Sequence, residues 1–213
     1  FVSKPTFDPN LFVDGIDADS WRELNESIDK PLLNRALRGT YPPGSTFKPF
    51  MAMAGLYYNV IAPTDSKFCS GSFHLPGVNR PWLDWEKKGH GSVDMVKAIK
   101  TSCDVYFYGL ANSLGVDRIH DYLASYSFGL PTGIDIEGEK KATLPSTAWR
   151  RQAFKDKAMQ TWYPGDTINV GIGQGFLTVT PIQLAHATAA IAMHGKRFQP
   201  RLVHAIRDSV SGV

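Results

Sequence analysis

The sequence has few cysteines, no long apolar run and no excess of charge of either sign. Only two of its 213 residues are Cys, too few for a disulfide framework. No apolar run reaches the roughly 18 residues that a membrane-spanning helix needs. The 23 Lys and Arg are nearly balanced by 20 Asp and Glu and are not blocked together, which argues against a nucleic-acid partner. A chain of this length and composition is expected to bury one core, with room for a subdomain.

Signals for nucleotide chemistry are also missing. The glycine-rich run over residues 171–175 lacks the Lys-Ser/Thr ending and the flanking strand and helix of a phosphate-binding loop. We therefore interpret its glycines as positions where the backbone approaches other segments closely. The basic pair Arg150-Arg151 is interpreted as part of a solvated face.

The pattern of apolar and turn-forming residues predicts a domain that is rich in helix and has few strands. Helices are expected over residues 20–27, 45–58, 93–100, 102–114, 117–126, 147–154 and 182–194. Ser20 is expected to cap the first of them, with Glu23 completing a capping box. We expect strands at the start of the chain and over residues 197–207, a long loop or weak hairpin over residues 64–91, and a turn over residues 162–166.

The segment over residues 41–50, YPPGSTFKPF, combines a turn with two reactive side chains. Its Pro and Gly residues precede an apolar run, so Ser45 is expected at or near a helix N-terminus. Lys48 follows about one helical turn later, so the two side chains share one face. A hydroxyl and an amine held this close form a nucleophile–base pair. The backbone N–H groups at the helix start suit a developing oxyanion.

A second cluster, Ser102-Cys103-Asp104, falls on another boundary between a turn and a helix. Ser-x-x-Lys alone arises by chance in many proteins. Followed by Ser-x-Asp, it is the signature of penicillin-interacting serine acyl-transferases. The two motifs together predict an enzyme that works through a covalent acyl intermediate.

The resemblance extends along nearly the whole chain. The transpeptidase domain of class B penicillin-binding proteins, in particular of their elongation-specific members, resembles this sequence at residues 41–50, 84–85, 89–91, 165–167, 171–175 and 180–183. The resemblance implies the α+β fold of penicillin-binding proteins and serine β-lactamases. It also implies that the helix-rich part of that fold is present and that the central antiparallel sheet is incomplete in this chain.

The resemblance assigns a role to each residue of the two motifs. Ser45 would be the acylated nucleophile and Lys48 the base that deprotonates it. Ser102 would relay the proton toward the leaving amine, and Asp104 would position a substrate amide or Lys48. The implied reaction is attack on the D-Ala-D-Ala end of a peptidoglycan stem peptide, followed by transfer to the amine of a neighbouring stem. β-Lactams would acylate the same serine.

The third motif of the family, Lys-Ser/Thr-Gly on a core strand, is not found between residues 1 and 213. We expect it C-terminal to Val213, and we expect the first core strand to precede Phe1. The chain is therefore interpreted as a partial transpeptidase domain over residues 1–213. Removing one oxyanion donor lowers kcat about a hundredfold to a thousandfold. Because the substrate-binding strand would be missing as well, this fragment alone is expected to be almost inactive.

Four residues form a candidate metal site. Two thiols, an imidazole and a carboxylate make a closed tetrahedral set for structural Zn²⁺; here they would be Cys69, Asp84, His90 and Cys103. Some members of the family resemble this in carrying zinc on mixed Asp, His and Cys ligands. Two alternatives stay open, namely a disulfide between the two cysteines and two unlinked buried thiols.

The resemblance also implies partners and a location. It implies stem peptides and β-lactams as ligands, a membrane glycosyltransferase and elongation-complex proteins as partners, and no nucleic acid. The chain would be the periplasmic domain of an inner-membrane protein whose anchor lies outside this sequence. Two other functions remain as alternatives. One is a serine β-lactamase or D,D-carboxypeptidase, for which Glu137 or Glu139 would hold a deacylating water, and the other is a non-catalytic cell-wall sensor or scaffold.

Overall fold

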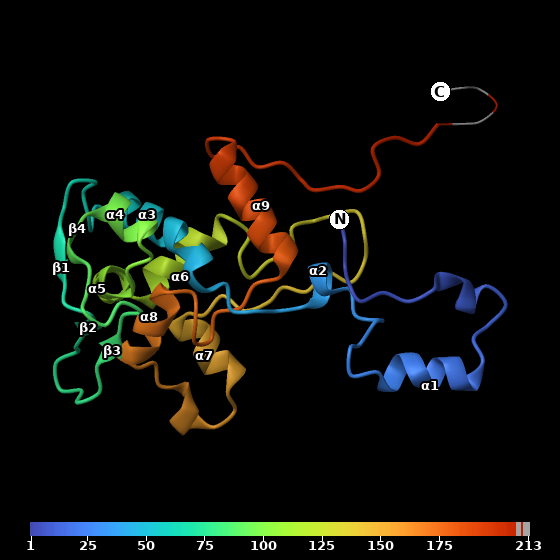
Figure 1. Cartoon of the computed structure of the whole chain (residues 1–213), viewed down its shortest axis with the longest axis horizontal. Coiled ribbons are helices and arrows are strands. Elements are labelled where there is room, and N and C mark those ends of the chain that lie inside the picture. Colours follow the sequence, from blue (N-terminus) through green and yellow to red (C-terminus); the bar gives the residue numbers. More distant parts are fainter. Residues whose placement is uncertain (208–209, 211–213) are drawn as a thin grey trace. The chain divides into compact units, whose positions relative to one another are not determined.

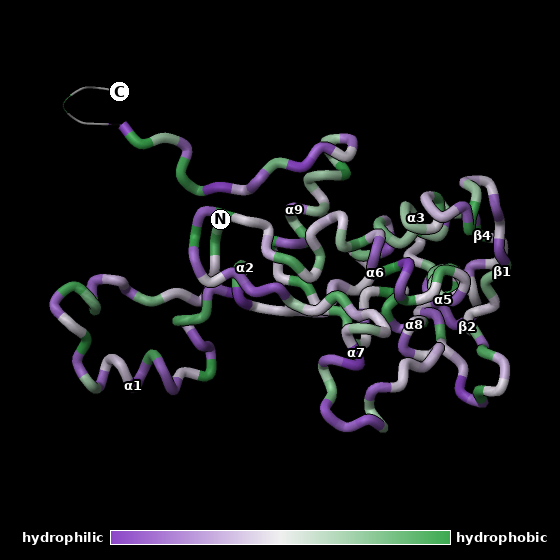
Figure 2. Tube along the Cα trace, turned by 180° about the vertical axis from the view of Figure 1, so that it is seen from behind, coloured by the Kyte–Doolittle hydropathy of each residue, from purple (hydrophilic) through white to green (hydrophobic). Residues whose placement is uncertain are grey.

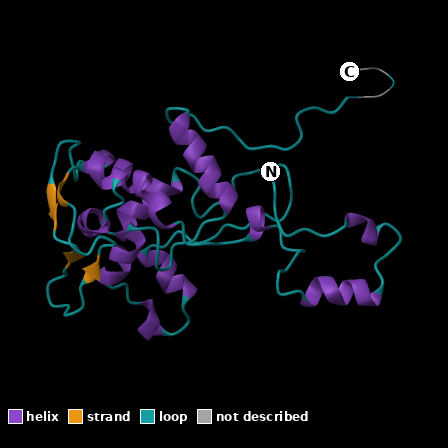
Figure 3. Ribbon diagram, viewed as in Figure 1, coloured by secondary structure: helices purple, strands orange, loops and turns teal. Residues whose placement is uncertain are grey.

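The computed structural model describes residues 1–207 and 210, and these residues form helices with a few short strands (Figures 1 and 3). In chain order the elements are η1 (Pro9–Phe12), α1 (Ala18–Glu26), α2 (Arg35–Arg38), η2 (Gly44–Phe47), α3 (Lys48–Tyr57), β1 (Lys67–Cys69), β2 (Ser72–Phe73), β3 (Trp82–Leu83), β4 (Gly91–Val93), α4 (Met95–Lys100), α5 (Asp104–Leu114), α6 (Val116–Ala124), α7 (Thr147–Ala153), η3 (Lys157–Gln160), α8 (Pro164–Gly171) and α9 (Pro181–Ala192). Among the described helices, none has the length and apolar character to cross a membrane. The expected helix-rich α+β architecture is confirmed.

The chain forms two compact units. The first contains Phe1–Tyr41, Leu130–Lys141 and the chain from Thr180 onward. Its small core joins Leu37, Ile134 and Ile182. The side-chain amide of Gln183 donates to the carbonyls of Leu130 and Lys141 at 2.7 Å each, which ties α9 to the ends of the 130–141 segment. Helix α1 has no buried residue, and Figure 2 shows hydrophilic and hydrophobic residues mixed along it.

The second unit, Pro42–Gly129 and Ala142–Val179, contains all eight predicted site residues. Helix α5 is its central element, and seven of its eleven residues are buried. Because α5 is covered on most faces by α3, α8 and the short strands, the side chains at its N-terminus are held firmly. At Gly171 of α8, a Cβ would lie 2.4 Å from that of Ala111, so glycine lets α8 pack directly on α5.

The long segment over residues 64–91 contains short strands. Strand β1 pairs antiparallel with β4, placing Cys69 opposite Gly91, and β2 pairs with β3. These two small ladders give the segment more order than a loop, but they are too short to bury a core of their own. The expectation of a weak hairpin is therefore confirmed in part.

The expected strands at the two ends of the chain are wrong within the described residues. No strand forms in the first residues or over 197–207. Instead, the carboxylate of Asp135 accepts hydrogen bonds from the N–H groups of Leu202 and Val203 at 2.7 and 2.9 Å. A side chain thus satisfies the donors that a strand partner would otherwise take.

Two other expectations are corrected. Residues 162–166 do not form only a turn, because α8 begins at Pro164 and runs into the glycine-rich run. Proline suits the first helical position, and the Asp166 carboxylate accepts the N–H of Tyr163 at 3.1 Å. In α1 the cap is Asp17 rather than Ser20, because Asp17 accepts the N–H groups of both Asp19 and Ser20.

Candidate active site and metal centre

Ser45 lies in the 3₁₀ turn η2 that leads into α3, so the expected helix start is confirmed with a tighter first turn. The preceding residue, Gly44, donates its N–H to the carbonyl of Gly173 at 2.9 Å. Gly173 has φ +75°, and a Cβ there would lie 2.2 Å from the Gly44 carbonyl oxygen. The glycine-rich run is therefore packed against the backbone just before Ser45, which confirms the close backbone approach expected of its glycines.

Lys48 is buried at the first position of α3, and its ammonium group has a complete set of acceptors. Its Nζ donates to the Ser102 carbonyl at 2.7 Å, to Ser102 Oγ at 2.9 Å and to Asp104 Oδ1 at 2.6 Å. The ring of Phe107, one turn after Asp104 on α5, lies 5.6 Å from Nζ and adds a cation–π contact. From the sequence, Phe107 was expected only on the inner side of its helix, although its spacing from Asp104 places it on the same helix face.

Ser102 connects the lysine to the nucleophile. Its Oγ accepts the hydrogen bond from Lys48 and donates to Ser45 Oγ at 2.8 Å. The sequence predicted a direct Ser45–Lys48 pair, whereas the structure joins the two through the Ser102 hydroxyl. Ser102 has φ +53°, a left-handed conformation that costs a non-glycine residue about 1–3 kcal/mol. The fold therefore holds this hydroxyl at the cost of local backbone strain.

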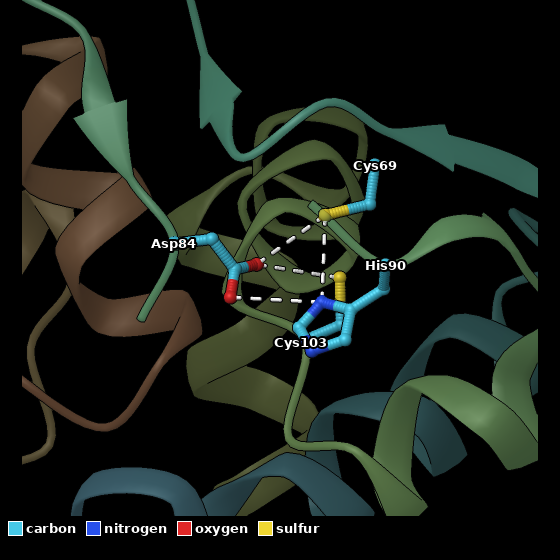
Figure 4. Close-up of side chains that lie close together, drawn as sticks. All are labelled: Cys69, Asp84, His90 and Cys103. Carbon is cyan, nitrogen blue, oxygen red and sulfur yellow. Dashed lines mark hydrogen bonds and ion pairs between the residues drawn. The ribbon is translucent and has the colours of Figure 1, made fainter. Parts of the chain in front are cut away.

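The four candidate metal ligands also come together (Figure 4). Cys69 ends β1, Asp84 follows β3, His90 precedes β4 and Cys103 precedes α5. Their four ligand atoms all lie within 4.8 Å of one another, and both cysteines are free and buried. The disulfide alternative is thus not the arrangement found here.

Several separations in this cluster are close to those between the ligands of a tetrahedral metal ion. Asp84 Oδ2 is 3.5 Å from Cys69 Sγ and 3.4 Å from Cys103 Sγ. His90 Nδ1 is 3.6 Å from Cys69 Sγ and 3.7 Å from Asp84 Oδ1. Zinc bonds of 2.0–2.3 Å at tetrahedral angles require edges of about 3.3–3.8 Å between ligand atoms. These four separations, in which Asp84 faces the thiols with Oδ2 and His90 with Oδ1, are close to those edges, and the donor set is of the kind that Zn²⁺ prefers.

Charge in the cluster is balanced by backbone donors. Burial by itself raises the pKa of Asp84, but hydrogen bonds from the N–H groups of Val105 and Glu86 and from both thiols outweigh burial and lower the pKa. Burial raises the pKa of the Cys103 thiol well above its usual range. A Cys103 thiol that keeps its proton beside an ionised Asp84 is a metal-free state, and a divalent cation would bind there by displacing that proton.

Comparison with known proteins gives one family and several close relatives. The model of the penicillin binding protein transpeptidase domain matches residues 1–212. The peptidoglycan D,D-transpeptidase MrdA of Acinetobacter baumannii is 46% identical over 204 residues, which is 96% of this chain and 30% of that protein. The chain thus spans less than a third of this curated relative.

Two solved structures are similar over nearly the whole chain. Pseudomonas aeruginosa PBP2 in complex with WCK 5153 has a TM-score of 0.90 and 45% identity, covering 96% of this chain and 46% of that chain. Helicobacter pylori PBP2 in complex with MreC has a TM-score of 0.87 and 33% identity, covering 94% and 36%. The fold expected from the resemblance along the chain is confirmed by these neighbours.

Proposed function

Because the chain belongs to the penicillin-binding protein transpeptidase domain family, we propose that it carries the nucleophile region of a peptidoglycan D,D-transpeptidase. The observation that carries this proposal is the hydrogen-bonded series from Lys48 Nζ through Ser102 Oγ to Ser45 Oγ. Such a series provides a nucleophile, a proton relay and a base within hydrogen-bond reach of one another.

In the proposed reaction, Ser45 Oγ attacks the carbonyl carbon of the penultimate D-Ala of a stem peptide. The serine proton passes by way of Ser102 to Lys48, which must first be in its neutral form. Collapse of the tetrahedral intermediate breaks the peptide bond, and the departing D-Ala amine takes a proton back through Ser102. The amine of a second stem then attacks the acyl-enzyme to form the cross-link and releases Ser45.

The remaining residues hold this machinery in position. Asp104 pairs with the Lys48 ammonium at 2.6 Å, and both side chains are largely buried. The N–H of Ser45 would donate to the oxyanion. We propose that a second oxyanion donor comes with the third motif and its strand, outside residues 1–213, so that the domain is completed by the rest of the polypeptide.

We also propose Cys69, Asp84, His90 and Cys103 as the ligands of a structural Zn²⁺ ion. The 3.4–3.7 Å separations between the ligand atoms support this assignment. When bound, zinc would supply positive charge to two thiolates and a carboxylate, and it would cross-link segments that have little core of their own. No catalytic step is assigned to it.

The proposal extends to location and partners. We propose that stem peptides and β-lactams are the ligands of Ser45, and that the domain lies in the periplasm, held by a membrane anchor outside this sequence. The Helicobacter pylori complex with MreC supports an elongation-complex protein as a partner. A membrane glycosyltransferase is proposed as a second partner.

Acylation of the intact protein by a fluorescent penicillin tests the function. We expect a covalent adduct that persists for hours and disappears in Ser45→Ala, as a transpeptidase requires. Deacylation within a second would instead indicate a β-lactamase or carboxypeptidase, and no adduct at all would indicate a scaffold. Of the two carboxylates considered for a deacylating water, Glu139 already accepts the N–H groups of Thr132 and Gly133.

A further inference from the structure

His90 differs from the other candidate metal ligands in how it is held. It lies between Gly89 and Gly91, which have φ values of +77° and +69°. Its Nδ1 faces the cluster, while its buried Nε2 has no hydrogen-bond partner among the described residues. Metal-bound imidazoles are usually oriented by a hydrogen bond from the second ring nitrogen. Here the orientation of the ring must come from another contact.

Lys97 provides that contact through the backbone. Its Nζ donates to the carbonyl of His90 at 2.9 Å and to the carbonyl of Ser92 at 2.8 Å. The ammonium group therefore holds the chain on both sides of Gly91, the residue that offers the least conformational resistance. Lys97 was not singled out from the sequence, where it looks like one more exposed lysine.

Lys97 is itself anchored on α4. Asp94 caps this helix and accepts the Lys97 N–H at 2.7 Å. The Lys97 carbonyl accepts the hydroxyl of Thr101 at 2.9 Å, immediately before the Ser102 turn. The Trp85 and His90 rings also meet in an edge-to-face arrangement, with centroids 5.3 Å apart. The Lys97 side chain thus joins the backbone around His90 to the helix that leads to the second serine motif.

We propose that Lys97 is the positioning residue that presents His90 to the metal, replacing the missing hydrogen bond at Nε2. This inference rests on the zinc site proposed above. Removing Lys97 would free the glycine-flanked backbone, so the imidazole would have to be ordered each time a metal binds. Outer partners of metal ligands typically change affinity about 10-fold to 100-fold, which is the effect expected here.

The test uses the intact protein and its zinc affinity rather than its activity. Zinc dissociation constants are measured by competition with a chromophoric chelator for wild type, Lys97→Met, Lys97→Arg and Lys100→Met. Methionine keeps the length and helix propensity of lysine without the charge. Lys100 is the matched control, since it is an exposed lysine on the same helix.

We expect Lys97→Met to bind zinc about 10-fold to 100-fold more weakly, Lys97→Arg to recover most of the affinity, and Lys100→Met to match wild type. The melting temperature of the metal-free forms should stay close to wild type, while the rise on adding zinc becomes smaller for Lys97→Met. Wild-type affinity in Lys97→Met would refute the positioning role alone. A wild-type protein that binds no zinc would overturn both this role and the metal site. Should Lys97→Met fail to fold, Lys97→Gln is measured in the same way.

Discussion

Replacing Gly173 by alanine should displace the nucleophile without touching any catalytic side chain. The added Cβ would lie 2.2 Å from the Gly44 carbonyl oxygen and 2.7 Å from the Gly44 nitrogen. Both atoms belong to the backbone next to Ser45, so no flexible side chain can move aside. The Gly44 backbone must retreat by about 1 Å to reach ordinary van der Waals contact.

The expected consequences are a loss of stability of about 2–5 kcal/mol and a slower acylation of Ser45. Alanine at φ +75° costs about 1–2 kcal/mol in backbone strain. Overpacking against Gly44 adds about 1–3 kcal/mol. A displacement of about 1 Å at a reacting atom lowers the rate roughly a hundredfold. The acylation rate with a fluorescent penicillin should therefore fall about a hundredfold.

Gly77→Ala is the matched control for this experiment. Gly77 has the same φ of +75°, but nothing lies within 4 Å of a Cβ built there. It should share the strain cost in chemical unfolding and keep the wild-type acylation rate. If Gly173→Ala also acylates at the wild-type rate, the packing of the glycine-rich run does not position Ser45, and the reasoning fails.

Three further predictions concern the relay, the metal and a buried arginine. Ser102→Gly should keep the left-handed turn without strain, yet slow acylation about 10²- to 10⁴-fold because the relay hydroxyl is gone; unchanged acylation kinetics would refute the relay. Zinc affinity should rise with pH, because burial raises the pKa of the Cys103 thiol and the metal must displace its proton; a titration that shows no pH dependence would contradict thiolate ligation. Arg150→Met should destabilise the protein by about 2–4 kcal/mol in denaturant unfolding, since it breaks a buried ion pair with Asp166 and three cation–π contacts, whereas Arg151→Met should cost less than about 0.5 kcal/mol.

Local chemistry explains which features the sequence could predict. The turn before Ser45 and the apolar run after it both act within a few residues, so the position of the nucleophile followed from spacing. The ligand set followed from residue types that zinc prefers. Features that depend on distant partners did not follow. Arg150 was interpreted as part of a solvated face. It is in fact buried, where it pairs with Asp166 and contacts aromatic rings.

The Ser102 relay was missed as a bridge for a similar reason. Spacing along one helix placed Lys48 near Ser45, but it could not show that Ser102 would enter between them from another segment. The length of α8 was also missed, because glycine and proline signal a turn when their neighbours are unknown. At the other end of α8, Gly171 belongs to the glycine-rich run, and it packs against Ala111 as the last residue of the helix.

Cys103 connects the two candidate sites because it lies between two residues of the catalytic site and itself belongs to the metal cluster. Ser102 and Asp104 both contact Lys48, while Cys103 between them contacts Asp84. Cys103 has an extended backbone, so its side chain points away from those of its neighbours.

Asp84 completes this connection at the start of α5. Cys103 gives α5 no side-chain cap, and Asp84 accepts the N–H of Val105 at 3.0 Å instead. A carboxylate from the metal cluster thus satisfies a donor at the helix end that carries Asp104. Filling the cluster with a cation would restrain Asp84 and Cys103 together. Zinc would therefore affect the position of Ser45 only indirectly, by holding the Ser102 turn against Lys48.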